Sequence, residues 1–189
     1  MRGGVWELTA VPELRLAAAR LGARHGLEEV RMQDVADQSA VSITTVYRYY
    51  PTKHHLFAAL LFHYTKTAAP PGPTTGHPVA DVTELMAGII RNMLARPQLA
   101  RAMITSVNAR RAESTASGDY NLRSNILDVA GIAAPSGDQT QIALLLEQCA
   151  YGILSWAITG ETTPEQAERD MRRACELLLA PWRRRTRTT

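Results

Sequence analysis

The amino-acid sequence predicts an all-α fold. Apolar residues recur at intervals of three and four along most of the 189 residues, which places them on one face of successive helices. No convincing run alternates with a period of two, and β-branched residues are scattered rather than clustered, so strands are not expected. Prolines and glycines divide the chain into separate helical segments.

The N-terminal third predicts four helices. Proline suits the first turn of a helix, so a first helix is expected from near Pro12 to a stop at Gly26. A short second helix spans Met32 to Gln38, and a third lies in SITTVYRYY. Thr52 is expected to cap the fourth. The predicted inward-facing residues of the first, second and fourth helices are Leu14, Ala17, Ala18, Leu21, Val35, Ala36, Leu56, Phe57, Leu60, Leu61 and Tyr64.

A proline-rich stretch follows at residues 67–78, with the sequence TAAPPGPTTGHP. Four prolines and two glycines in twelve residues cannot continue a helix. We interpret the stretch as a joint between an N-terminal domain, residues 1–66, and a larger helical domain, residues 79–182. A loop within one domain is the alternative.

Five further helices are expected beyond this joint. Their predicted ranges are 79–95, 97–111, 120–130, 138–159 and a last helix that starts at Thr163-Pro164-Glu165. The 138–159 segment is apolar almost all round, which predicts burial against its own domain and against a partner chain. The basic tail PWRRRTRTT is expected to be frayed.

Composition excludes several classes of protein. The chain is 46% hydrophobic and 21% charged, typical of a globular protein, and its net charge of +3 is compatible with nucleic acid. Two distant cysteines do not predict a disulfide framework. The start, MRGGVWELTAV, lacks the apolar core of a signal peptide, and no apolar run reaches the ~18 residues of a membrane span. We expect a cytoplasmic protein without a membrane partner.

The three N-terminal helices predict a helix-turn-helix unit. Small Ala36 suits the close approach of the third helix, and Ala40 with Val41 forms the turn. Three residues of the third helix, Val46, Tyr47 and Tyr50, are expected to face inward. The hydroxyl of Tyr47 is expected to reach outward.

The outer surface of the third helix carries groups that suit DNA. Small hydroxyl residues at its start, Ser42, Thr44 and Thr45, let the backbone enter a major groove and bond base edges. Arg48 and the tyrosine hydroxyls are expected to bind flanking phosphates. Lys53 lies in the first turn of the next helix, where the helix dipole is unfavourable for a cation. A lysine at this position is well placed to bind a phosphate.

The run from Leu14 to Leu61, above all VADQSAVSITTVYRYYPTKHHLFAAL, resembles the DNA-binding domain of the TetR family of bacterial repressors. In that family the third helix typically ends in a tyrosine, two variable positions, an aromatic residue, a variable residue, then Ser, Thr or Asn, then Lys. This sequence has at those positions Tyr47, Arg48, Tyr49, Tyr50, Pro51, Thr52 and Lys53. Two features depart from the pattern: Ala40 replaces the usual Gly, and the N-terminus lacks the basic arm of some members.

The resemblance implies a homodimer on palindromic double-stranded DNA, in which the last two long helices form a four-helix dimer bundle. It also implies DNA contacts by Gln33, Thr44, Thr45, Tyr47, Tyr49 and Lys53. NMLARPQLARAMITSVNA resembles, more weakly, the KstR-like subgroup, which implies a small hydrophobic effector derived from an acyl chain or a steroid.

An effector pocket is predicted in the C-terminal helices, because methionines fill irregular space and adapt to ligands. The candidate lining residues are Met86, Ile90, Met93, Met103, Val107, Gln148 and Trp156. At any one of these positions plain core packing is the alternative.

The sequence does not predict an enzyme. It shows neither a Gly-rich phosphate loop nor a nucleophile elbow, and adjacent His54 and His55 point apart on a helix, so they cannot share a metal. No catalytic residue, cofactor or metal is expected. The predicted function is a ligand-responsive transcriptional repressor. The alternatives are a ligand-independent or architectural DNA-binding protein, and a helical enzyme or adaptor outside transcription.

Overall fold

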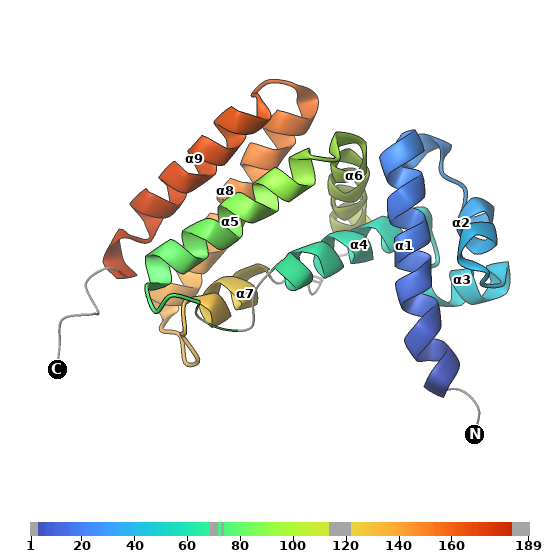
Figure 1. Ribbon diagram of the computed structural model, residues 1–189, viewed down its shortest axis with the longest axis horizontal. Coiled ribbons are helices and arrows are strands. Elements are labelled where there is room, and N and C mark those ends of the chain that lie inside the picture. Colours follow the sequence, from blue (N-terminus) through green and yellow to red (C-terminus); the bar gives the residue numbers. More distant parts are fainter. Residues whose placement is uncertain (1–3, 69–71, 73, 114–121, 183–189) are drawn as a thin grey trace. The chain divides into compact units, whose positions relative to one another are not determined.

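The computed structural model describes residues 4–68, 72, 74–113 and 122–182, with side chains from residue 11 onward. Every regular element in this part of the chain is a helix, which confirms the all-α fold class (Figure 1). The elements are α1 (Gly4–Glu29), α2 (Met32–Ser39), α3 (Ile43–Tyr49), α4 (Lys53–Ala68), α5 (Pro78–Leu94), α6 (Pro97–Glu113), α7 (Leu122–Val129), α8 (Gly137–Thr159) and α9 (Pro164–Leu178).

The helices form two compact units. The first unit contains α1, α2, α3, most of α4, and α6; the second contains the end of α4 with α5, α7, α8 and α9. The sequence assigned α6 to the C-terminal domain, 79–182, whereas α6 packs along α1. A division by contacts does not decide which part folds alone, so the predicted boundary within 67–78 stays a prediction.

The first helix is longer than predicted. The expected start near Pro12 is wrong, because α1 begins at Gly4 and holds Pro12 inside it. The segment before Pro12 contains helix formers such as Glu7 and Leu8, which favour the extension. The predicted stop at Gly26 is confirmed, because the regular helix breaks there and residues 27–29 follow it as a separate helical piece. Gly26 has φ 73° and ψ 178°, a backbone conformation that is essentially restricted to glycine.

The predicted inner faces of α1, α2 and the first part of α4 form the core of the first unit. Leu14, Val35 and Leu56 are fully buried, and Leu61 is partly exposed. Tyr64, in the end of α4 that belongs to the second unit, is also partly exposed. α6 adds buried Leu99 to this core. The predicted cap of α4 is also confirmed, since the amide of His55 donates to the Thr52 hydroxyl at 3.4 Å.

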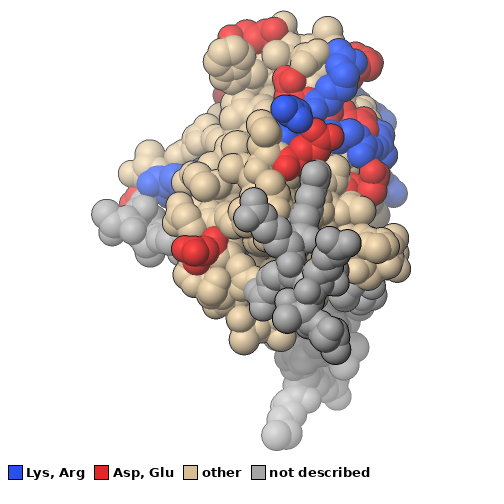
Figure 2. All heavy atoms as spheres, turned by 90° about the vertical axis from the view of Figure 1, so that its left-hand side faces the viewer, with Lys and Arg blue, Asp and Glu red and all other residues tan. Residues whose placement is uncertain are grey.

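In the second unit α5 and α8 both pack against α9 (Figure 1). Arg172 on α9 reaches Glu84 on α5 at 2.5 Å, and Arg91 on α5 reaches Glu168 on α9 at 2.8 Å. Hydrogen bonds from Arg91 and Arg172 lower the pKa of Glu168 to about 2. Figure 2, which looks onto this unit, shows basic and acidic side chains intermixed in one cluster. The charges therefore neutralise one another here and tie α5 to α9.

Asp81 fastens the end of the proline-rich stretch to α5. Its buried carboxylate accepts hydrogen bonds from the amides of Thr74 and Thr75, at 3.0 and 3.0 Å, and from the Thr75 hydroxyl at 2.7 Å. Burial alone would raise the pKa of Asp81, but these hydrogen bonds outweigh it and lower the pKa. Residues 74–77 are thus anchored to the second unit.

Two predictions about the C-terminal part are wrong. The first is that no apolar run reaches the length of a membrane span. By length and composition alone α8 is long and apolar enough to cross a membrane, although buried or interface helices pass the same test. Pro181 and Trp182, predicted to be frayed, continue the chain after α9 in a 3₁₀ turn with Trp182 buried. A large aromatic side chain gains free energy by burial, which accounts for the ordered turn at Trp182. The rest of the tail lies outside the described residues.

Candidate nucleic-acid interface

The start of α3 is organised by two hydroxyl side chains. Ser42 is the N-cap, and its Oγ accepts the amide of Thr45 at 3.3 Å and lies 2.9 Å from the Thr45 hydroxyl. Thr44, between them, is exposed. Ser42 and Thr45 therefore hold the helix start in shape, while Thr44 stands on its outer face.

The seven-residue α3 has a narrow inner stripe. Val46 is fully buried and Tyr50 is 9% exposed, which confirms Tyr50 as a core residue. Tyr47, predicted to place its ring inward, is 50% exposed. Positions 46 and 50 are one helical turn apart and fill the inner stripe, so Tyr47 rotates outward. Its ring and its hydroxyl lie on the same outer face as Thr44 and Arg48.

Tyr49 differs from its predicted placement. Its ring is partly covered, and its hydroxyl oxygen is buried without a hydrogen-bond partner in the described part of the chain. The guanidinium carbon of Arg48 lies 5.1 Å from the centre of the Tyr49 ring, within the range of a cation–π contact. Arg48 is exposed and Tyr49 supports it, but the Tyr49 hydroxyl is not on the outer surface.

The turn between α2 and α3 is tight because Ala40 adopts a left-handed conformation, with φ 54° and ψ 28°. The Val41 amide then closes the turn onto the Ala36 carbonyl at 3.2 Å. Such a conformation favours glycine, and alanine there stores strain. On the outer side of α2, Gln33 is exposed and donates from Nε2 to Asp37 at 2.8 Å.

Lys53 has a protein partner that the sequence did not predict. Its Nζ donates to the backbone carbonyls of Leu27, at 2.9 Å, and of Glu28, at 3.2 Å. These carbonyls follow the break at Gly26, next to the C-terminal end of the long helical part of α1, where a positive charge complements the helix dipole. Lys53 thus joins the start of α4 to the end of α1, and its side chain is only partly exposed.

His54 and His55 contact α6 within the first unit. His54 Nδ1 lies 3.2 Å from the Ser106 hydroxyl, and His55 Nε2 lies 2.7 Å from Nη1 of Arg110. Burial, followed by the positive charge of Arg110, lowers the pKa of His55. A neutral His55 therefore accepts the Arg110 hydrogen bond, and the pair links the two helices.

The predicted effector residues lie in different places. Met86, Ile90 and Met93 are buried in the second unit, and Met103 with Val107 is buried in the first. Gln148 and Trp156 are exposed on α8. The structure thus does not gather the seven within one unit, and their joint role in a pocket stays a prediction.

One face of α8 is apolar and uncovered. Leu145 is 37% exposed and Trp156 is 59% exposed, and Cys149 and Gly152 lie between them on the same helical stripe. A Cβ placed on Gly152 would meet no atom within 4 Å in the described part of the chain. Only 28% of the most apolar window of α8 is buried, so this face is left for another surface.

Among the described residues, no three His, Cys, Asp or Glu side chains gather in a way that would hold a metal ion. Cys175 is buried, and burial raises the pKa of its thiol to about 11, so the thiolate needed for nucleophilic chemistry is disfavoured. In the first unit, exposed hydroxyl, phenol and guanidinium groups lie together on the outer face of α3, at Thr44, Tyr47 and Arg48.

Two family models match the chain, one before the proline-rich stretch and one from the end of that stretch onward. Residues 14–60 match the model of bacterial regulatory proteins of the tetR family, and residues 76–178 match the tetracyclin repressor-like C-terminal domain.

Individual relatives agree with the family models. The crystal structure of a TetR transcriptional regulator from Rhodococcus sp. RHA1 is 33% identical, has a TM-score of 0.80, and aligns over 90% of this chain and 95% of its own. The HTH-type transcriptional repressor KstR of Rhodococcus jostii RHA1 is 25% identical over 177 residues, 89% of this chain and 82% of the relative. FadR of Thermus thermophilus, a TetR-family repressor solved with lauroyl-CoA, is 18% identical with a TM-score of 0.57, over 89% of this chain and 93% of its own; at this identity the likeness concerns the fold alone.

Proposed function

The chain belongs to the TetR family of bacterial regulatory proteins, and we propose that it is a homodimeric repressor that binds palindromic operator DNA and responds to a small hydrophobic effector. Members of this family regulate transcription rather than catalyse a reaction, and the chain is accordingly a regulator and not an enzyme. The remaining questions are which residues bind DNA, how two chains meet, and what releases them.

The outer face of α3 carries the proposal for DNA binding. Val46 and Tyr50 hold the helix on its own core, which leaves exposed Thr44, Tyr47 and Arg48 on the opposite side. A threonine methyl and hydroxyl suit base edges, whereas a phenol and a guanidinium suit phosphates. Gln33, Ser42, Thr45 and Lys53 are proposed as supporting contacts, and Tyr49 acts through Arg48.

The uncovered stripe of α8 supports a homodimer. Leu145 and Trp156 offer apolar area, and Gly152 between them allows close approach of a partner helix. A two-fold interface places the same stripe of both chains face to face, with α9 beside it. Leu177 of α9, 60% exposed, extends the apolar area.

A dimer of this kind regulates by the spacing of its two α3 helices. In the binding-competent state they stand about 34–36 Å apart, one turn of DNA. An effector that binds a state with another spacing more tightly lowers the population of the binding-competent state. The loss of DNA affinity can be no larger than the ratio of the effector's affinities for the two states. We place the hinge at α4 and the proline-rich stretch. The effector is proposed to be derived from an acyl chain or a steroid, following the resemblance to the KstR-like subgroup.

The experiment that tests the proposal measures binding of the purified protein to its own promoter-region DNA at several salt concentrations. A repressor binds this DNA in preference to random DNA, with an affinity that falls steeply with salt. Equal binding to random DNA would favour an architectural protein, and no binding would favour an adaptor.

Native mass spectrometry of the same sample tests the dimer. Trp156→Glu places a charge on the apolar stripe of α8 and is expected to shift the protein toward monomer, whereas Glu161→Gln, just beyond the end of α8, is the control. A variant that stays fully dimeric would place the interface elsewhere.

A further inference from the structure

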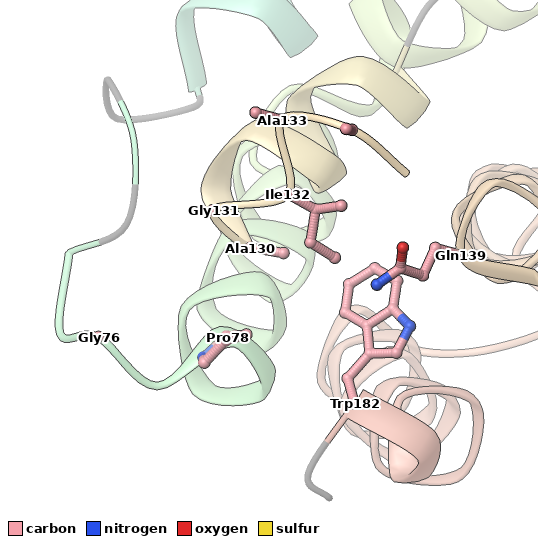
Figure 3. Close-up of a pocket in the computed structure, with 9 residues that line it drawn as sticks. Gly76, Pro78, Ala130, Gly131, Ile132, Ala133, Gln139 and Trp182 are labelled. Carbon is pink, nitrogen blue, oxygen red and sulfur yellow. The ribbon is translucent and has the colours of Figure 1, made fainter. Parts of the chain in front are cut away.

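A second feature of the C-terminal part is a cavity that none of the predicted effector residues lines. A cavity of about 410 Å³ opens in the second unit between the start of α5, the loop that joins α7 to α8, and the 3₁₀ turn after α9 (Figure 3). Its volume is within the range of small-molecule sites. It is lined by Gly76, Pro78, Ala130, Gly131, Ile132, Ala133, Ala134, Gln139 and Trp182.

Two buried donors border this cavity without a partner. Gln139 is 6% exposed and Trp182 is 5% exposed, yet Nε2 of Gln139 and Nε1 of Trp182 have no hydrogen-bond acceptor among the described residues. In Figure 3 both side chains, together with Ile132, point toward the same space. A buried donor left unpaired costs about 1–3 kcal/mol, so two such groups on one cavity call for an acceptor inside it.

The orientation of the Gln139 amide is determined by the local fold. Its Oε1 accepts the backbone amide of Ser136 at 2.8 Å, and the Ser136 hydroxyl accepts the amide of Gln139 at 3.3 Å, which together form a capping box at the start of α8. Exchanging oxygen and nitrogen would set two donors against each other. The nitrogen is therefore the atom left for the cavity.

The walls decide what kind of acceptor fits. Ile132, Pro78 and the alanines of the loop are apolar, and among the described residues that line the cavity there is no Arg, Lys or His to neutralise an anion. A buried carboxylate would lack a counter-charge, whereas water alone would leave the apolar part of the walls, about half of the lining, in contact with water. An uncharged carbonyl oxygen on a short apolar body satisfies both the donors and the walls.

We propose that this cavity binds a small neutral carbonyl compound, a ketone, ester or amide, whose oxygen accepts hydrogen bonds from Gln139 Nε2 and Trp182 Nε1. Such a ligand joins the start of α5, the α7–α8 loop and the end of α9. What its binding does to DNA affinity rests on the proposed function, but the binding itself does not.

Nuclear magnetic resonance of the full-length ¹⁵N-labelled protein tests the site directly, with 2-hexanone as the probe. Its oxygen is expected to produce a saturable shift of the Trp182 indole N–H resonance, which Trp182→Phe identifies by its loss. Hexylamine, which has the same chain but a cationic donor, is expected to leave that resonance in place. Hexanoate is expected to bind more weakly than the ketone.

The matched variants are Gln139→Glu and Gln141→Glu. Glutamate at position 139 can still complete the capping box, so α8 folds, but it removes the donor; binding of 2-hexanone is expected to fall at least tenfold. Position 141 is exposed, so the same change there is expected to leave binding unaltered. Trp182→Phe keeps an aromatic ring but removes the indole N–H resonance, so the backbone ¹⁵N–H resonance of Ile132 reports the same loss of binding.

Three results overturn the proposal: 2-hexanone fails to shift the indole resonance saturably, Gln139→Glu binds it as well as the unchanged protein, or hexanoate binds more tightly than 2-hexanone. No DNA enters this experiment. A protein that binds the ketone but not its promoter region would therefore refute the proposed repressor function and leave the site standing, and the reverse holds as well.

Discussion

The Nζ atom of Lys53 lies 2.9 Å from the backbone carbonyl oxygen of Leu27. A lysine in the first turn of α4 opposes the dipole of its own helix, but here it complements the C-terminal end of α1. The contact fixes the start of α4 relative to α1 in the first unit. A lysine that suggests a phosphate ligand from the sequence is thus also part of the fold.

Lys53→Ala separates these two roles. Loss of the hydrogen bonds to α1 is expected to lower the free energy of unfolding by about 0.5–1.5 kcal/mol. If Lys53 also binds a phosphate, affinity falls for all DNA sequences. The slope of log affinity against log salt concentration then becomes shallower by about one. Lys66→Ala, which removes an exposed lysine of α4, is the control for charge. An unaltered salt slope with lower stability would make Lys53 purely structural.

Ala40→Gly is expected to stabilise the protein. Ala40 has φ 54°, and an L side chain in the left-handed region costs about 1–2 kcal/mol, more than the ~0.4–1 kcal/mol that glycine loses through the freedom of the unfolded chain. A gain of about 0.5–1 kcal/mol in urea unfolding is expected. Gly26→Ala, at φ 73° with nothing within 4 Å of an added Cβ, tests the same argument in the opposite direction and should destabilise. A loss of stability in Ala40→Gly would contradict the strain.

Gly22→Ala is expected to destabilise the first unit. An added Cβ would lie 2.5 Å from Cε1 of Phe57, a fully buried ring, and 3.1 Å from Cδ1 of Leu99. Overpacking of this kind costs about 1–3 kcal/mol, which exceeds the helix propensity that alanine adds. In α5, Gly88→Ala meets no atom within 4 Å and is expected to raise stability by up to ~1 kcal/mol. Thermal unfolding of the two variants should therefore shift in opposite directions.

The sequence was sufficient for features that depend on local chemistry. The apolar spacing of Leu14 and Leu21, the glycine at position 26, and the capping threonines 52 and 163 all predict elements that the structure contains. Such signals act within a few residues along the chain, where helix geometry determines which groups meet.

Features that depend on distant partners were not predictable in this way. The acceptors of Lys53 lie 25 and 26 residues away, and the partners of His54 and His55 lie more than 50 residues away. Gln139 did carry a local signal, because Ser136 three residues earlier predicts a capping box. The sequence does not show that Nε2 of Gln139 lacks a partner in the described part of the chain, or that Trp182 lines the same cavity.

Stability of the first unit is expected to fall as the pH drops below about 6.5. The pKa of His55 is lowered in the folded protein by burial and by Arg110, so the unfolded chain takes up a proton that the folded chain resists. The loss begins near the unfolded value of 6.5 and continues down to the folded pKa. His55→Gln is expected to flatten this part of the curve in urea unfolding from pH 7.5 to 5, whereas His77→Gln removes an exposed histidine of the second unit as a control. Equal slopes with and without His55 would show that another group causes the decline.

Removal of one hydroxyl distinguishes the two tyrosines at the end of α3. Tyr47 is 50% exposed on the outer face, so Tyr47→Phe is expected to weaken operator binding several-fold by losing about 1 kcal/mol of hydrogen bonding. The hydroxyl of Tyr49 is buried and unpartnered in the described part of the chain, so Tyr49→Phe removes an uncompensated polar atom. That variant is expected to bind DNA as before and to unfold at the same or a higher urea concentration. Fluorescence anisotropy with promoter-region DNA compares the pair. A loss of affinity in Tyr49→Phe equal to that in Tyr47→Phe would mean that α3 turns on contact with DNA and exposes the second hydroxyl.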